Sequence, residues 1–102
     1  MSKAVQSVLR KDYEDLFFFL DREECGITYS PSFREFGLLV RPRSQVQQQL
    51  RFCPFTGKAL PESLRDRFFD EIEKLGLIDG LADIERAPAE FQSEEWWIKR
   101  GL

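Results

Sequence analysis

The chain has 102 residues, of which 42% are hydrophobic and 32% charged, and its formal net charge is −3. This length predicts a single domain over residues 1–102, and the apolar content, with ten phenylalanines, excludes a disordered chain. Two cysteines and no histidine do not supply the about four ligands of a structural zinc site, nor a histidine base. We therefore expect no metal, no cofactor and no enzymatic activity.

The first predicted element is an N-terminal helix within residues 1–20. Its apolar side chains recur at the three- and four-residue spacing of an amphipathic helix, and they are Val5, Val8, Leu9, Tyr13, Leu16 and Leu20. Ser2 is a suitable cap, and we expect the helix to continue to about Phe18. The apolar run that ends this segment is too short for a signal sequence or a membrane span, so we expect a cytoplasmic protein.

Three adjacent phenylalanines, Phe17, Phe18 and Phe19, end this helix. Neighbouring side chains on a helix diverge by about 100°, so the three rings cannot all face one core. Either they fill the space between helix and sheet, or some of them contact a partner chain. Both alternatives stay open from the sequence.

Residues 25–61 predict a small antiparallel sheet of about three strands, near 27–29, 36–41 and 46–52. Alternation places Ile27 and Tyr29 on one face, and the last strand turns Gln47, Gln49 and Arg51 away from the face that holds its apolar residues. A solvated sheet face explains this pattern, and a shallow polar binding surface is the alternative.

A local excess of basic residues accompanies this sheet. Its members are Arg34, Arg41, Arg43, Arg51 and Lys58. This is a small number of charges for phosphate binding, so we keep weak nucleic-acid binding as an alternative function.

Residues 52–61 have the form of a metal knuckle that lacks one ligand. Cys53, Pro54 and Gly57 stand in the pattern Cys-Pro-x-Cys-Gly, but Thr56 occupies the second cysteine position. We interpret this degenerate knuckle as a metal-free corner that leads through Pro61 into the next helix. Cys53 as a reactive thiol is the less favoured alternative.

Residues 62–102 predict the helical part of the domain. A helix is expected over 62–75, with Gly76 as a left-handed C-cap. A short helix capped by Ser93 then carries Trp96 and Trp97. Since adjacent side chains diverge, we expect one tryptophan in the core and the other half exposed or facing another subunit.

Three blocks of the chain together resemble a family of small uncharacterised bacterial and phage proteins. The blocks are residues 29–38, residues 52–63 and the Glu-Trp-Trp segment ending at Trp97. The resemblance implies a domain of unknown function with a zinc-ribbon-like site built on Cys-Pro-Trp-Cys-Gly. Only Cys53 of the knuckle pair is present here and Cys25 has no clear counterpart, which implies that this member has lost its metal.

These observations predict an α+β domain in which the N-terminal helix and the central helix pack on one face of the sheet. The aromatic excess and the missing catalytic groups favour a non-catalytic protein-interaction module, which we expect to bind a partner protein or to form a homodimer. The expected interaction residues are Phe17, Phe18, Phe19, Trp96 and Trp97.

Overall fold

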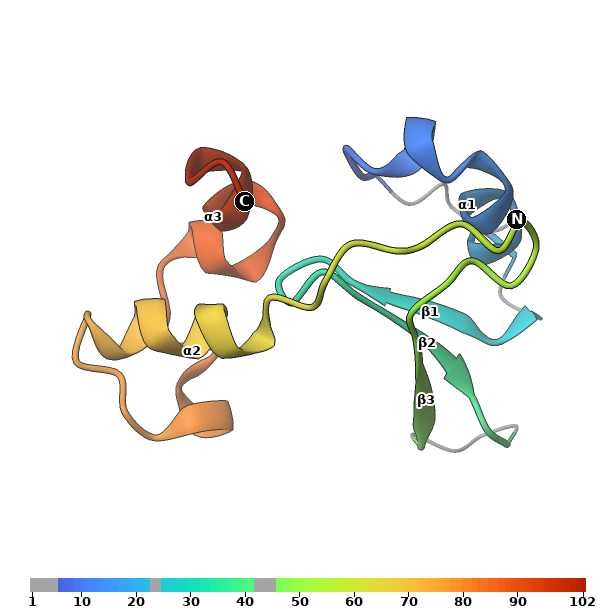
Figure 1. The fold of residues 1–102 in the computed structure, drawn as a ribbon. Coiled ribbons are helices and arrows are strands. Elements are labelled where there is room, and N and C mark those ends of the chain that lie inside the picture. Colours follow the sequence, from blue (N-terminus) through green and yellow to red (C-terminus); the bar gives the residue numbers. More distant parts are fainter. Residues whose placement is uncertain (1–5, 23–24, 42–45) are drawn as a thin grey trace. The chain divides into compact units, whose positions relative to one another are not determined.

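The computed structural model describes residues 6–22, 25–41 and 46–102 (Figure 1). The chain divides into two compact units. Unit 1 comprises Met1–Tyr29 and Glu35–Glu62, and unit 2 comprises Ser30–Arg34 and Ser63–Leu102. Within these ranges, three α-helices and a three-stranded antiparallel sheet confirm the predicted α+β class. No helix of the described residues combines the length and the apolar character that crossing a bilayer requires.

The N-terminal helix of unit 1 is shorter than predicted. A 3-10 turn covers Arg10–Asp12, and helix α1 covers only Glu14–Leu20. Between them Tyr13 leaves the helical conformation at φ −135° and ψ 50°, and its hydroxyl donates to the Ala59 carbonyl at 2.7 Å. This contact with a distant part of the chain accompanies the break. The start of the predicted helix, including Ser2 and Val5, lies outside the described residues.

The sheet of unit 1 has the order β1-β2-β3. Its strands are β1 Ile27–Ser30, β2 Glu35–Leu39 and β3 Gln47–Leu50. Strands β2 and β3 pair from Phe36 opposite Leu50 to Leu39 opposite Gln47. This register places Phe36 and Leu50 on one face, as the alternation predicts, and Gln47 and Gln49 on the other.

Helix α1 and the apolar face of the sheet share one core. Its buried side chains are Leu16, Phe17, Leu20, Phe36 and Cys53, with six partly buried apolar side chains packed against them. The Phe17 ring meets those of Tyr29 and Phe36 edge-on, each with centroids 5.8 Å apart. The predicted packing of the N-terminal helix on the sheet is therefore present in unit 1.

The opposite face of the sheet is polar and closely packed around Gly37. The Thr28 hydroxyl donates to the Gln47 side-chain oxygen across this glycine, and a Cβ at position 37 would collide with both side chains. Gly37 therefore permits the side chains of the two outer strands to meet over the central one.

Unit 2 is built around helix α2, Arg65–Glu73. The helix begins three residues later than predicted, because Leu64 holds a non-helical conformation and donates its N–H to the Phe33 carbonyl at 2.8 Å. It ends at Glu73 rather than at residue 75. The predicted cap is present: Gly76 has φ +87°, and the Leu77 N–H donates to the Ile72 carbonyl at 3.2 Å in a Schellman motif. Since α2 belongs to unit 2, its predicted packing on the sheet stays a prediction.

Short helices complete unit 2. They are η3 Gly80–Asp83, η4 Ala89–Gln92 and α3 Glu95–Lys99. The Phe68 ring of α2 packs against rings from η4, α3 and the turn before β2. Its centroid lies 5.7 Å from Phe91, 5.7 Å from Trp96 and 4.9 Å from Phe33. Unit 2 thus has an aromatic core of its own.

Candidate interaction surface

The three adjacent phenylalanines of α1 have three different environments. Phe17 is fully buried, Phe18 is 50% exposed, and Phe19 is intermediate. Helical rotation explains this, because only one of three successive residues can face the sheet. Phe17 therefore belongs to the core, while Phe18 and Phe19 reach the surface of unit 1.

The exposed rings continue into the degenerate knuckle. Phe19 meets Phe18 edge-on at 5.1 Å and stacks on Phe55 at 4.1 Å, and Phe55 is 44% exposed. We call Phe18, Phe19 and Phe55 the aromatic row. Arg22 extends it, because its guanidinium lies 3.6 Å from the Phe18 ring centroid and also donates to the Phe18 carbonyl at 2.6 Å. The row is therefore held in place at its Phe18 end by Arg22.

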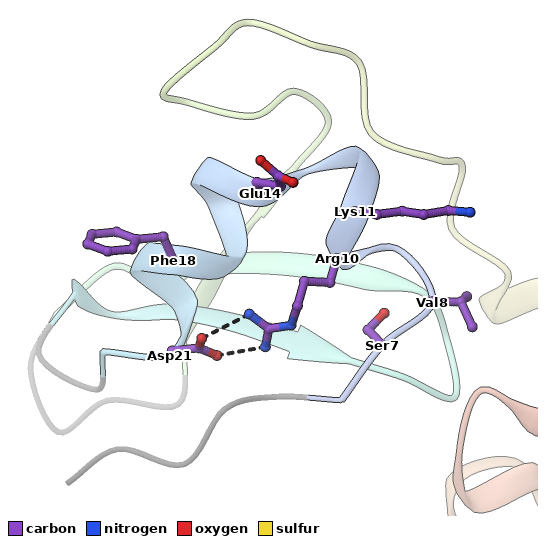
Figure 2. A pocket seen from close by; sticks show the side chains of 7 residues that line it. All are labelled: Ser7, Val8, Arg10, Lys11, Glu14, Phe18 and Asp21. Atoms are coloured by element: carbon purple, nitrogen blue, oxygen red, sulfur yellow. Dashed lines mark hydrogen bonds and ion pairs between the residues drawn. The ribbon is translucent and has the colours of Figure 1, made fainter.

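Phe18 also lines a shallow depression of about 660 Å³ in unit 1 (Figure 2). The lining residues are Ser7, Val8, Arg10, Lys11, Glu14, Phe18 and Asp21. Figure 2 shows Phe18 and Val8 on opposite sides of an ion pair between Arg10 and Asp21. Val8, like Phe18, is 50% exposed, so the depression has two apolar sides.

The ion pair in the depression is bidentate. Both terminal nitrogens of Arg10 donate to the Asp21 carboxylate, each at 3.0 Å. Hydrogen bonding to Asp21 raises the pKa of the Arg10 guanidinium above its ordinary value, and this group also lies 5.1 Å from the Phe17 ring centroid. Charged groups of both signs line the depression. A protein surface with polar and apolar groups is therefore a better ligand for it than a polyanion.

The degenerate knuckle closes on backbone hydrogen bonds. The Gly57 N–H donates to the Cys53 carbonyl and the Cys53 N–H to the Lys58 carbonyl, each at 2.8 Å. Gly57 has φ +75°, a conformation that side-chain-bearing residues disfavour. Thr56, in the second cysteine position, accepts the Lys58 N–H at 3.2 Å through its hydroxyl. These hydrogen bonds therefore hold the turn of the knuckle together.

The knuckle cysteine belongs to the core of unit 1. Cys53 is 2% exposed, Cys25 is intermediate, and both thiols are free. Lys58 points toward the segment just before α1, since its ammonium donates to the Asp12 carbonyl at 2.7 Å and lies 4.8 Å from the Tyr13 ring centroid. Within the described part of the chain, no group of three or more cysteine, aspartate or glutamate side chains is arranged to hold a metal.

Both tryptophans are buried, so the expectation that one of them is half exposed or faces another subunit is wrong. Trp96 is fully buried and Trp97 is 4% exposed. The Trp96 indole donates to the Ser32 carbonyl at 2.7 Å and the Trp97 indole to the Pro31 carbonyl at 2.8 Å. The turn at Ser30–Arg34 therefore covers both rings, and neither lies on the surface of unit 2.

The predicted basic residues are divided between the units. Arg34 belongs to unit 2, where it has φ 51°, donates to the Leu102 carbonyl at 2.9 Å and lies 5.3 Å from the Trp97 ring centroid. Arg41, Arg51 and Lys58 are exposed in unit 1, and Arg43 lies outside the described residues. A single basic surface formed by these residues therefore stays a prediction.

Several residues of this surface are not predicted by the sequence pattern. Phe55 stands where the resembling knuckles have tryptophan, and this aromatic position is the one feature of the sequence from which its contact could be inferred. Arg10 and Asp21 are eleven residues apart, with the break at Tyr13 between them, so helical spacing does not reveal their pairing.

The whole arrangement falls within one sequence family. The family model described as "Domain of unknown function (DUF6980)" matches residues 4–99. The chain belongs to this family. The match includes the aromatic row, the depression, the knuckle and both tryptophans, so these are parts of the DUF6980 domain. Comparisons with curated proteins and with solved structures found no match.

Proposed function

We propose that this DUF6980 domain is a non-catalytic protein-interaction module, which binds a partner protein through the aromatic row and the adjoining depression of unit 1. The observation that supports this is the continuity of the surface, from Phe55 through Phe19 to Phe18 and into the depression. Contiguous exposed aromatic rings are typical of protein-binding sites and are more than scattered surface hydrophobicity.

The energetics favour such a contact. Phe18 and Phe55 are each about half exposed, so a partner that covers both rings gains about 1 kcal/mol or more from each. Phe18 is also held by Arg22, which lowers the entropy lost when a partner orders it. The two rings are therefore the expected hot spots of the interface.

The depression indicates the chemistry of the partner. Val8 and Phe18 offer apolar contacts on its two sides, and Arg10 is already neutralised by Asp21. A partner segment with an apolar side chain and neutral hydrogen-bonding groups fits these features better than a phosphate-rich ligand. Nucleic-acid binding remains the alternative. It predicts that the protein is retained on a nucleic-acid probe, and that this retention is lost at higher salt concentration and in the Arg41→Glu or Arg51→Glu variant.

The proposal is tested by comparing what the wild type and three variants capture from a lysate of the source cells. Phe18→Ser and Phe55→Ser should each lose proteins that the wild type retains. Ile78→Ser is the matched control, because Ile78 is 75% exposed and lies in unit 2. Capture that is unchanged by both phenylalanine substitutions, or is lost equally with Ile78→Ser, would refute this use of the surface.

We also infer that the knuckle is a metal-free remnant of a zinc-ribbon-like turn. Cys53 lies in the core, and the turn holds together through the hydrogen bonds at Gly57 and Lys58. Elemental analysis of protein purified without chelator should therefore find no stoichiometric zinc. About one zinc per chain would contradict the inference, since it would require ligands beyond the two cysteines.

A further inference from the structure

Strand β3 is an edge strand, and the orientation of its backbone groups follows from its pairing with β2. The Val40 N–H donates to the Val46 carbonyl at 3.1 Å, just before β3. In an antiparallel ladder, groups of alternate residues point to the same side. Residues 46, 48 and 50 therefore bond to β2, while the backbone groups of Gln47 and Gln49 point to the outer edge.

Beyond the end of β3, another segment of the chain already pairs with the outer edge. Along β3 itself the edge is open to a further strand. The Leu60 N–H donates to the Arg51 carbonyl at 2.9 Å and the Cys53 N–H to the Lys58 carbonyl at 2.8 Å, around a bridge between Phe52 and Ala59. Along β3 itself, the register with β2 turns the backbone N–H groups of Gln47 and Gln49 to this edge. The Gln49 carbonyl accepts a bond from the neighbouring Gln48 side-chain amide at 3.4 Å, which a pairing strand would replace. The open stretch therefore stops at Leu50.

This open edge is short, but it carries neither the charge nor the proline that usually prevents strand addition. Residues 46–50 read Val-Gln-Gln-Gln-Leu, with no charge and no proline. Residues 46–49 are exposed, and Val46 is 65% exposed. Proteins normally protect an exposed edge with lysine, proline, a bulge or a covering segment. An uncharged, exposed edge of this kind favours pairing with another strand.

We propose that β3 pairs with β3 of a second copy of this chain, antiparallel and with the two-fold axis at Gln48. In this register Gln47 of each copy faces Gln49 of the other, and these are the residues whose backbone groups point outward. They exchange N–H to carbonyl bonds as hydrogen-bonded pairs, while the two Gln48 residues form the non-hydrogen-bonded pair between them. The paired stretch ends at residues 46 and 50, where Leu60 already occupies the edge at Arg51.

The side chains of the strand are self-complementary in this register. On the apolar face Val46 of one copy lies opposite Leu50 of the other, so two partly exposed apolar side chains cover each other. On the polar face the Gln47 and Gln49 amides lie opposite each other and can exchange hydrogen bonds. No charged residue falls within the paired stretch, so like charges do not oppose across it. These matches favour a second copy over an unrelated strand.

One short strand pair is a small interface, so the association is weak and concentration dependent. Sedimentation velocity of the wild type should therefore show a rise from the 12.0 kDa monomer toward twice that mass as concentration increases. A wild type that remains monomeric at the highest soluble concentration would overturn the proposal.

The position of the axis gives a sharper test. Gln48→Lys and Gln48→Glu each place like charges opposite each other on the axis, so each variant alone should sediment as a monomer. An equimolar mixture of the two should associate at least as strongly as the wild type. Leu81→Lys and Leu81→Glu are the controls, because Leu81 is 69% exposed in unit 2, and they should behave as the wild type alone and mixed. Association of the single Gln48 variants, or none in their mixture, would overturn the proposed register.

Amide exchange provides a readout that does not depend on substitution. The amides of Gln47 and Gln49 should become protected only as concentration rises, whereas those of Gln48 and Leu50 should be protected throughout by the ladder with β2. Protection of Gln47 and Gln49 that does not change with concentration would contradict the pairing.

Phe18→Ser should leave self-association intact. A failure of the aromatic row as a partner site can therefore be distinguished from a failure of this edge. Loss of association in Phe18→Ser, with Gln48→Lys unaffected, would assign the contact to the aromatic row instead.

Discussion

Trp97→Phe tests whether the indole groups hold the turn at Ser30–Arg34. Trp97 is 4% exposed, donates to the Pro31 carbonyl at 2.8 Å and lies under the Arg34 guanidinium. Phenylalanine retains an aromatic ring there but cannot donate a hydrogen bond. The substitution therefore removes one of the two indole hydrogen bonds between α3 and the turn, while leaving the Trp96 bond and most of the apolar contact.

The expected loss can be worked from these contacts. A hydrogen bond contributes about 0.5–1.5 kcal/mol net, and the smaller ring with its weaker attraction for Arg34 removes about 0.5–1 kcal/mol more. The free energy of unfolding should fall by about 1–2.5 kcal/mol. With a urea dependence of about 1–3 kcal/mol per molar for a small domain, the denaturation midpoint should move down by about 1 M.

The assay is urea denaturation followed by tryptophan fluorescence. Both tryptophans of the chain lie in unit 2, so the Trp96 that remains in the variant reports on that unit alone. Ile98→Ala is the control, because Ile98 neighbours Trp97 on α3 but is 46% exposed. A Trp97→Phe midpoint equal to that of the wild type, or a larger shift for Ile98→Ala, would refute the assigned role of the indole.

Two further predictions concern pH and the knuckle. Hydrogen bonds from Lys74 first, and then from Arg100, lower the pKa of Glu71 from its usual 4.5, so the stability they provide is complete above pH 4.5 and is lost as pH falls through the folded pKa. In Glu71→Gln, the free energy of unfolding should therefore fall less as pH is lowered through this range. An unchanged pH dependence would contradict the ion pairs. Gly57→Ala should cost about 1–2 kcal/mol, because φ is +75° there while no atom within 4 Å opposes a Cβ. Thermal denaturation measures this cost, and a Gly57→Ala variant as stable as the wild type would show that the turn relaxes.

The sequence predicted those features that short-range periodicity determines. Alternation along β3 assigned Gln47 and Gln49 to the face opposite Leu50, and the pairing with β2 confirms it. Gly76 was predicted as a C-cap from its place after the apolar stripe of α2, and the bond from Leu77 to Ile72 confirms that motif. In each case the residues that decide the conformation lie within a few positions of one another.

The errors arose where a distant residue decides the conformation. The apolar spacing before α1 suits a helix, but the chain breaks at Tyr13, whose hydroxyl bonds to Ala59. Adjacent tryptophans do diverge on α3, yet Pro31 and Ser32 bring carbonyls to both indoles. A pattern read within one segment cannot show that a second segment covers its far side.

The turn at Ser30–Arg34 joins two segments that are far apart in the sequence. The strands on either side of it belong to unit 1, but the turn itself belongs to unit 2. There Phe33 packs on Phe68 at 4.9 Å, and the carbonyls of Pro31 and Ser32 accept the two indoles. Unit 2 is therefore not a contiguous segment of the chain.

A fragment that contains only residues 63–102 lacks this turn, and it should not fold. Phe68 would lose an aromatic neighbour, both tryptophans would lose their hydrogen-bond acceptors, and Leu64 would lose the Phe33 carbonyl that receives its N–H at the start of α2. Far-UV circular dichroism and tryptophan emission of the fragment measure this, and a native-like emission would contradict it. If the fragment does not fold, unit 2 requires the segment between β1 and β2 as part of its own core.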